Sequence, residues 1–176
     1  IRGIAGVEFP PKMIQEYEKW YGPFPGITIT LEVAKAIGNA YGTVIRREGG
    51  KEVVVGYELR PFAKELTDAF IEGILETGCN VTDLGISLTP IVYFITAHNN
   101  FDGGVNVTGS HNVYFYNGFK MMKKNVWPLF GRELQAMRKM IEKSDFITDK
   151  KGKREAFDAN SPYRDYFLKH VHLARK

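Results

Sequence analysis

Between Thr30 and Val107 the sequence alternates between helical and strand patterns, and this alternation limits the fold more than any other feature. Apolar residues recur at helical spacing after Thr30, whose hydroxyl suits an N-cap. Strand patterns follow at 53–55, at 80–85 and up to Val107, and further helical patterns begin at Pro61 and Thr89. This order predicts an α/β fold, a three-layer domain with a mixed, mostly parallel sheet flanked by helices.

A polar segment interrupts the strand pattern directly after Val107. It reads Thr-Gly-Ser-His-Asn over residues 108–112, and a second short strand pattern follows at 118–122. We expect this second strand to run antiparallel, at or near an edge of the sheet, and to return Lys120 toward Ser110. Gly109 lets the backbone turn and approach a ligand closely. Because loops at strand ends carry the chemistry of α/β folds, this segment is the candidate site.

Composition excludes several classes of function. A chain of 176 residues with 44% apolar residues can build one domain with a core. No apolar run approaches the ~20 residues of a membrane span, and the start at Ile1 has neither a methionine nor a signal peptide, which predicts a trimmed chain. Cys79 is the only cysteine, which favours a reducing, cytoplasmic location. The net charge of +4 suits an anionic substrate but does not indicate a nucleic-acid partner.

The segment from Asp102 to Lys120 resembles the active-site serine loop of the α-D-phosphohexomutases, the phosphoglucomutase and phosphomannomutase superfamily. The similarity lies in Asp-Gly-Gly-Val, in Thr-Gly-Ser-His-Asn and in Tyr-Asn-Gly-Phe-Lys. Three other stretches agree in the same order, at 1–3, 55–60 and 83–90. The chain departs from the family pattern at Tyr57 and Glu58, where Arg and Asp are usual, and at Val113, where Pro is common.

The resemblance implies a phosphoserine mechanism. Ser110 would carry the phosphate that passes to the sugar, and an oxygen of that phosphate would be one ligand of Mg²⁺. Arg2 and Lys120 would offset the charge on the transferring group. Lys120 is also a candidate general base for the sugar hydroxyl, which requires its pKa to fall well below about 10.4. His111 would either donate a hydrogen bond to a phosphate or substrate oxygen, or brace the loop.

Four further residues are candidate phosphate- or substrate-binding groups, namely Thr108, Gly109, Asn112 and Arg60. For some of the candidates, composition alone favours a plainer role. Asn112 suits an Asx turn, Arg60 suits a salt bridge at a helix start, and Arg2 suits a surface position near a chain end.

The resemblance also implies the domain organisation. Residues 1–145 would form the first of four domains and carry the serine loop, while residues 146–176 would form a loop and helix leading to the second domain. Residues 9–30 are longer than the family's usual link, and their prolines and glycines predict an ordered excursion without long regular structure. The remaining Mg²⁺ ligands would lie in the absent second domain, so we expect the isolated chain to be inactive. The substrate would be a phosphorylated hexose, and a hexose 1,6-bisphosphate would act as activator.

Two other classes of function remain open. A serine hydrolase would need a nucleophile elbow of the form Gly-x-Ser-x-Gly, and Ser110 lacks that context. A non-catalytic phosphosugar-binding or protein-interaction module derived from a mutase would suit the changes at Tyr57, Glu58 and Val113. A dinucleotide-binding role is disfavoured, because no Gly-x-Gly-x-x-Gly follows a strand pattern.

Overall fold

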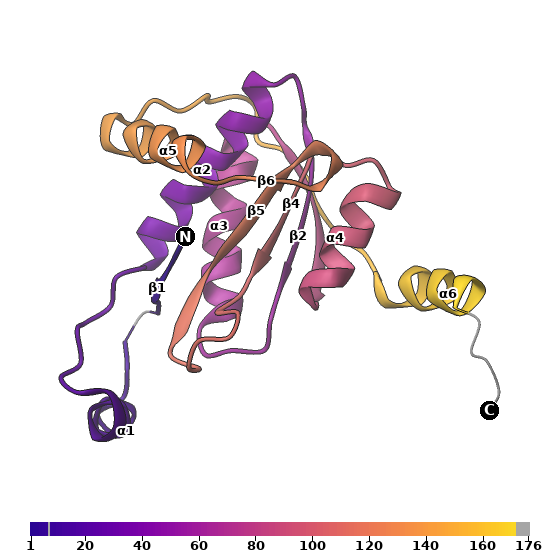
Figure 1. Cartoon of the computed structure of the whole chain (residues 1–176). Helices are drawn as coiled ribbons and strands as arrows, with labels where there is room; N and C mark the ends of the chain where they lie inside the picture. Colours follow the sequence, from indigo (N-terminus) through magenta and orange to yellow (C-terminus); the bar gives the residue numbers. More distant parts are fainter. Residues whose placement is uncertain (7, 172–176) are drawn as a thin grey trace, which may run out of the picture.

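A mixed sheet runs through the computed structural model of the chain, which describes residues 1–6 and 8–171 (Figure 1). Seven strands in this part of the chain pair in the order β1-β5-β4-β2-β3-β7, with β6 paired to β5. Neighbouring strands among β4, β2, β3 and β7 are parallel, and β5 runs antiparallel to β4. The strands are β1 (Arg2–Ile4), β2 (Glu52–Tyr57), β3 (Asn80–Ile86), β4 (Gly103–Val107), β5 (Tyr116–Lys123), β6 (Trp127–Pro128) and β7 (Arg154–Ala156). The predicted α/β class is confirmed, and the antiparallel strand lies next to the edge strand β1.

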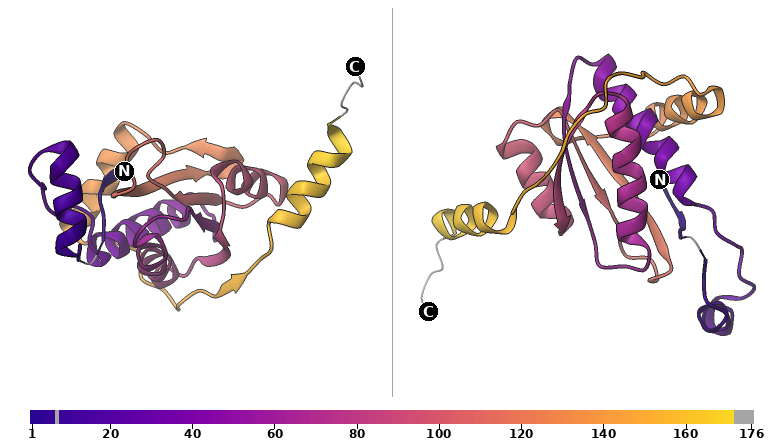
Figure 2. Two further views of the ribbon diagram at one scale, coloured as in Figure 1. Left: turned by 90° about the horizontal axis from the view of Figure 1, so that it is seen from below. Right: turned by 180° about the vertical axis from the view of Figure 1, so that it is seen from behind.

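Helices cover both faces of the sheet (Figure 2). Helices α2 and α3 pack on one face and α4 packs on the other, while α5 lies beside α2 and α6 extends outward from α4. The helices are α1 (Pro11–Tyr21), α2 (Leu31–Arg47), α3 (Ala63–Glu76), α4 (Thr89–His98), the 3₁₀ turn η1 (Lys124–Val126), α5 (Arg132–Lys143) and α6 (Asn160–His170). The predicted N-cap of α2 is confirmed, because Thr30 Oγ1 accepts a hydrogen bond from Val33 N (3.3 Å).

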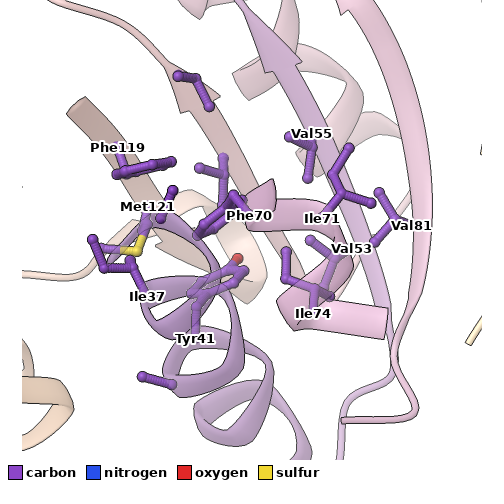
Figure 3. Packing of buried hydrophobic residues seen from close by; sticks show 14 of the residues in the cluster. Ile37, Tyr41, Val53, Val55, Phe70, Ile71, Ile74, Val81, Phe119 and Met121 are labelled. Atoms are coloured by element: carbon purple, nitrogen blue, oxygen red, sulfur yellow. The ribbon is translucent and has the colours of Figure 1, made fainter. Parts of the chain in front are cut away.

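The larger core lies between the sheet and helices α2 and α3 (Figure 3). Phe70 stacks between Tyr41 and Phe119, with ring centroids 6.0 and 4.7 Å apart. The buried Tyr41 hydroxyl donates to Met122 O (2.7 Å), and burial raises the pKa of this phenol. A Cβ atom on Gly103 would overlap that hydroxyl, so the glycine is needed for this close contact. The core thereby fixes β5, the strand that carries Lys120.

Three local predictions were wrong. The excursion 9–30 contains the 11-residue helix α1, which Pro10 and Pro11 start because a proline at N1 needs no hydrogen-bond partner. Pro61 lies before α3 rather than in it, since Phe62 adopts a left-handed conformation (φ 59°) and the helix begins at Ala63. The apolar spacing of Phe130, Leu134, Met137 and Ile141 predicts an amphipathic helix that includes Phe130, but Phe130 precedes α5 and is exposed.

The C-terminal part also differs from expectation. The sequence after Ser161 and Pro162 predicts a last helix with Tyr163, Tyr166, Phe167 and Val171 facing inward. Tyr166 and Phe167 are instead exposed, because α6 projects away from the sheet. Strand β7 was missed because its residues are all exposed and show no apolar pattern. It is held instead by Arg154, which forms ion pairs with Asp68 and Asp83 (2.7 and 2.6 Å). Residues 172–176 of the predicted connection lie outside the described residues.

Asp102 ties the start of β4 to the start of β2. Its Oδ2 accepts hydrogen bonds from the backbone N of Lys51 (2.8 Å) and of Glu52 (3.0 Å). Partial burial opposes ionisation, but these hydrogen bonds and the Lys124 ammonium together lower the pKa of the carboxyl below its ordinary value. We therefore expect Asp102→Ala to reduce the free energy of unfolding by about 1–2 kcal/mol at pH 7, measured by urea denaturation.

The direction of the pKa shift of Asp102 also determines how the stability difference between the unsubstituted and Asp102→Ala proteins depends on pH. Because the folded-state pKa of Asp102 is lowered, its contribution is complete at neutral pH and is lost as the pH falls below about 4, through the folded value. The difference in stability between the unsubstituted and Asp102→Ala proteins should therefore shrink as the pH falls below about 4. A difference that stays constant from pH 7 to pH 3 would contradict this assignment.

Candidate functional site

The loop between β4 and β5 is shaped by its own polar side chains. Thr108 Oγ1 accepts a hydrogen bond from Ser110 N (2.7 Å), and Asn112 Nδ2 donates to Gly109 O (3.1 Å). Ser110 has φ 54°, a left-handed conformation that costs about 1 kcal/mol for a residue with a side chain. Thr108 and Asn112, both predicted to bind phosphate or substrate, thus use these groups to form the loop, and Asn112 takes the turn-forming role that composition favoured.

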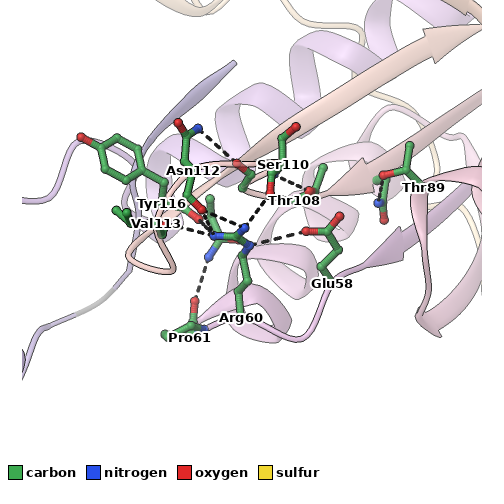
Figure 4. Close-up of polar contacts among 12 residues, drawn as sticks. Glu58, Arg60, Pro61, Thr89, Thr108, Ser110, Asn112, Val113 and Tyr116 are labelled. Atoms are coloured by element: carbon green, nitrogen blue, oxygen red, sulfur yellow. Dashed lines mark hydrogen bonds and ion pairs between the residues drawn. The ribbon is translucent and has the colours of Figure 1, made fainter.

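Arg60 clamps the loop from below (Figure 4). Its Nη2 donates to Ser110 O (2.7 Å) and Asn112 O (3.1 Å), and its Nη1 donates to the carbonyls of Asn112, Val113 and Tyr116 (3.1, 3.0 and 3.2 Å). Its Nε lies 3.5 Å from Glu58 Oε2, and only 14% of the Arg60 side chain is exposed. All three guanidinium nitrogens therefore have protein partners. The geometry favours a structural role for Arg60 over the phosphate-binding role that we predicted.

Gly109 is required by the same clamp. A Cβ atom at this position would lie 2.5 Å from Arg60 Nη1 and would overlap Tyr116 O. The glycine therefore allows the loop backbone to lie against the guanidinium. The backbone of Gly109 therefore lies close to Arg60, whereas we predicted from the sequence that it would lie close to a phosphate.

A cleft of about 450 Å³ lies on the other side of the loop. Its walls come from the end of β2, the first turn of α4, the serine loop and β5. It is lined by Glu58, Leu88, Thr89, Pro90, Tyr93, Ser110, His111 and Lys120. The structure thus brings Ser110, His111 and Lys120 to one cavity at the carboxyl end of the parallel strands, where α/β folds bind their ligands.

Asn106 fixes the position of α4 at this cleft. It is fully buried and lies opposite Lys120 in the β4–β5 ladder. Its amide is satisfied with Nδ2 donating to Gly56 O (3.0 Å) and Oδ1 accepting from the N and Oγ1 of Thr89 (3.2 and 2.7 Å). The positive end of the α4 dipole is therefore held beside Ser110 and Lys120, where it favours a negative group.

Arg2 is not among the residues that line the cleft. It is exposed on the edge strand β1 and pairs with Gly118, two residues before Lys120 on β5. Since side chains alternate along a strand, Arg2 and Lys120 share a face of the sheet, and such diagonal neighbours lie about 7–8 Å apart. A long guanidinium side chain at this position can extend toward the cleft.

Five of the eight residues that line the cleft were missed as site residues from the sequence, namely Glu58, Leu88, Thr89, Pro90 and Tyr93. Glu58 was noted only as a departure from a family pattern, and Thr89 only as a helix start. Glu58 directly follows β2, and Thr89 begins α4 shortly after β3 ends at Ile86, so the strand-end rule that selected Ser110 would also have selected them. No group of three or more His, Cys, Asp or Glu side chains suited to a metal ion occurs in residues 1–6 and 8–171.

The described part of the chain has no helix that is long and apolar enough to cross a membrane. Comparisons with known proteins give more specific information. Residues 12–148 match the family model described as phosphoglucomutase/phosphomannomutase, alpha/beta/alpha domain I. A phosphoglucomutase/phosphomannomutase of Thermococcus kodakarensis is 42% identical over 123 residues, which are 69% of this chain and 26% of that protein. A phosphomannomutase of Vibrio cholerae is 33% identical over 157 residues, which are 85% of this chain and 33% of that protein.

The fold agrees with these relatives. The crystal structure of a phosphoglucomutase/phosphomannomutase family protein from Burkholderia thailandensis superimposes with a TM-score of 0.80 at 33% identity, covering 86% of this chain and 34% of that one. The chain thus spans about a quarter to a third of the length of these relatives. With the family model matched over most of its residues, the chain belongs to the phosphoglucomutase/phosphomannomutase family and corresponds to its α/β/α domain I.

Proposed function

We propose that this chain is the catalytic-serine domain of a phosphohexomutase, an isomerase that interconverts hexose 1-phosphate and hexose 6-phosphate. The observation that carries the proposal is the meeting of Ser110 and Lys120 at one cleft, in a chain whose relatives are named phosphomannomutases and phosphoglucomutases. The substrate would be a phosphorylated hexose. A cytoplasmic location stays a prediction that rests on the single cysteine.

The proposed chemistry is phosphoryl transfer through Ser110. In the resting enzyme Ser110 Oγ carries the phosphate, and a hydroxyl oxygen of the sugar phosphate attacks the phosphorus. The bond from phosphorus to Ser110 Oγ breaks, the proton of the sugar hydroxyl passes to a base, Ser110 Oγ takes up a proton and leaves as the free hydroxyl, and a hexose bisphosphate is formed. Ser110 then takes the other phosphate back, which completes the isomerisation. A hexose 1,6-bisphosphate would act as activator by phosphorylating a free Ser110.

Each residue of the cleft has a part in this scheme. The Lys120 ammonium offsets negative charge on the transferring group, which is the main requirement of phosphoryl transfer, and Arg2 adds a second positive charge from the neighbouring strand. His111 is exposed at the cleft and can donate a hydrogen bond to a substrate oxygen. In an alternative role that excludes the first, Lys120 in its neutral form would be the base for the sugar hydroxyl.

The family implies Mg²⁺, and the chain's own residues do not make a complete site for it. Hard cations such as Mg²⁺ take oxygen ligands, and Glu58, the carboxylate of the cleft, is paired with Arg60. A phosphate oxygen on Ser110 would supply one ligand. We propose that the other Mg²⁺ ligands come from the part of the protein beyond domain I. Domain I would end near residue 145, and residues 146–176 would connect it to the next domain.

The incomplete metal site leads to a prediction about activity. The full-length protein that carries this chain should interconvert hexose 1- and 6-phosphates in the presence of Mg²⁺ and glucose 1,6-bisphosphate. The purified 176-residue chain should show no turnover in the same coupled assay. Turnover by the isolated chain would contradict the division of the site between domains. Labelling of Ser110 by a fluorophosphonate, with no isomerisation by the full-length protein, would instead indicate a hydrolase.

A further inference from the structure

The excursion between β1 and α2 begins and ends at the same place. Thr28 N and Ile29 N both donate to Ile4 O (2.8 and 3.1 Å), and Gly6 N donates to Ile29 O (3.1 Å). Residues 8–27 therefore form a closed structure with its own helix, α1, at the end of the sheet where the β4–β5 loop lies (Figures 1 and 2). The excursion is fixed to the edge strand that carries Arg2.

The inner side of the excursion is an aromatic cluster that includes a residue of the serine loop. Phe9 and Tyr17 are 4% and 6% exposed. Their ring centroids lie 6.0 and 5.3 Å from that of Phe115, and the Tyr17–Phe115 pair is edge-to-face. Phe115 itself is only 3% exposed and lies five residues after Ser110. Edge-to-face pairs of this kind contribute beyond the burial of their area.

The turn between β2 and α3 joins the same cluster. Phe62 packs against Phe9 with ring centroids 5.2 Å apart, and a Cβ atom on Gly6 would lie 2.6 Å from the Phe62 ring. Two residues earlier in this turn, Arg60 binds the carbonyls that flank Phe115. The second half of the serine loop is therefore held by the Arg60 guanidinium on one side and by the aromatic cluster on the other.

We propose that Phe9 and Tyr17 are positioning residues for Ser110, and that the excursion braces the serine loop. This inference rests on the proposed phosphoserine function. Ser110 has a left-handed backbone conformation, and such conformations persist only where the surrounding structure fixes them. The aromatic cluster supplies a restraint from outside the loop, and neither Phe9 nor Tyr17 lines the cleft.

The test compares two truncations within the same cluster. Tyr17→Ala removes a ring that packs on Phe115, whereas Phe24→Ala removes a ring that packs on Phe9 and Tyr17. In the full-length protein we expect Tyr17→Ala to speed amide hydrogen exchange over residues 110–116 and to lower kcat by on the order of 10- to 100-fold, with a smaller change in KM. Phe24→Ala should change both much less. Tyr17→Phe keeps the ring and should restore both.

Equal loop exchange and equal kcat in the Tyr17→Ala and Phe24→Ala proteins would overturn the proposal. If Tyr17→Ala does not fold, Phe115→Leu serves in its place, since it keeps an apolar side chain in the core and removes the ring contact. Hydrogen exchange tests the role of the excursion independently of the proposed phosphoserine function. If the unsubstituted protein shows no phosphate on Ser110, the function is wrong, while loop exchange in the variants still decides whether the excursion is a brace.

Discussion

Ser110→Ala is expected to lower kcat of the full-length protein by at least about 10⁴-fold, because the alanine lacks the cleft hydroxyl that is the proposed phosphate carrier. The alanine keeps the backbone N that donates to Thr108 Oγ1 and loses only the hydroxyl. We therefore expect the free energy of unfolding to change by no more than about 0.5 kcal/mol. Coupled mutase kinetics and urea denaturation measure the two quantities.

A matched control is Ser144→Ala, which removes a hydroxyl at the C-terminal end of α5. It should leave turnover unchanged. Turnover of the Ser110→Ala protein within about tenfold of the unsubstituted enzyme would exclude a covalent role for this serine. A large loss of stability in the Ser110→Ala protein would instead indicate that its turnover is low because it is poorly folded.

The second large effect is expected at Arg60. Arg60→Ala would remove the guanidinium donor from the carbonyls of residues 110, 112, 113 and 116, of which Val113 O keeps Tyr116 N as a donor, and would leave Glu58 without its cation. Removing one partner of such a buried group costs about 3–5 kcal/mol of the free energy of unfolding. Because Ser110 is displaced with the loop, kcat should also fall by on the order of 100-fold.

Two further variants show which property of Arg60 is responsible for the loss of stability. Arg60→Lys keeps the charge but not the planar fork, so we expect it to recover only part of the stability. Arg138→Ala removes an exposed arginine that pairs with Glu142 on the surface of α5, and it should cost less than about 0.5 kcal/mol. Urea midpoints give the comparison. Equal losses for Arg60→Ala and Arg138→Ala would show that the clamp does not hold the loop.

The sequence alone predicted the parts of the fold that depend on local patterns. The helix behind Thr30, the parallel strands and the antiparallel strand carrying Lys120 follow from apolar spacing and from capping chemistry. The serine loop was located because a polar run interrupts a buried strand. The meeting of Ser110 and Lys120 at one cleft follows from the antiparallel return of β5.

The parts that were missed depend on long-range contacts. Arg60 is separated from its partners in the loop by about fifty residues, and nothing in the local sequence distinguishes a clamp from a phosphate ligand. Glu58 lines the cleft because β2 lies next to β4 in the sheet. The buried side of helix α1 packs partly on Phe115, which lies almost one hundred residues further along the chain. These placements become visible only when the sheet is assembled.

The central claim is that Ser110 carries the phosphate. The most direct measurement incubates the full-length protein with Mg²⁺ and glucose 1,6-bisphosphate, then locates any added phosphate by intact and peptide mass spectrometry, with Ser110→Ala in parallel. The account predicts one phosphate on the peptide that contains Ser110 and none on that peptide in the alanine variant. A folded protein that acquires no phosphate, or one that keeps it in the alanine variant, would contradict the claim.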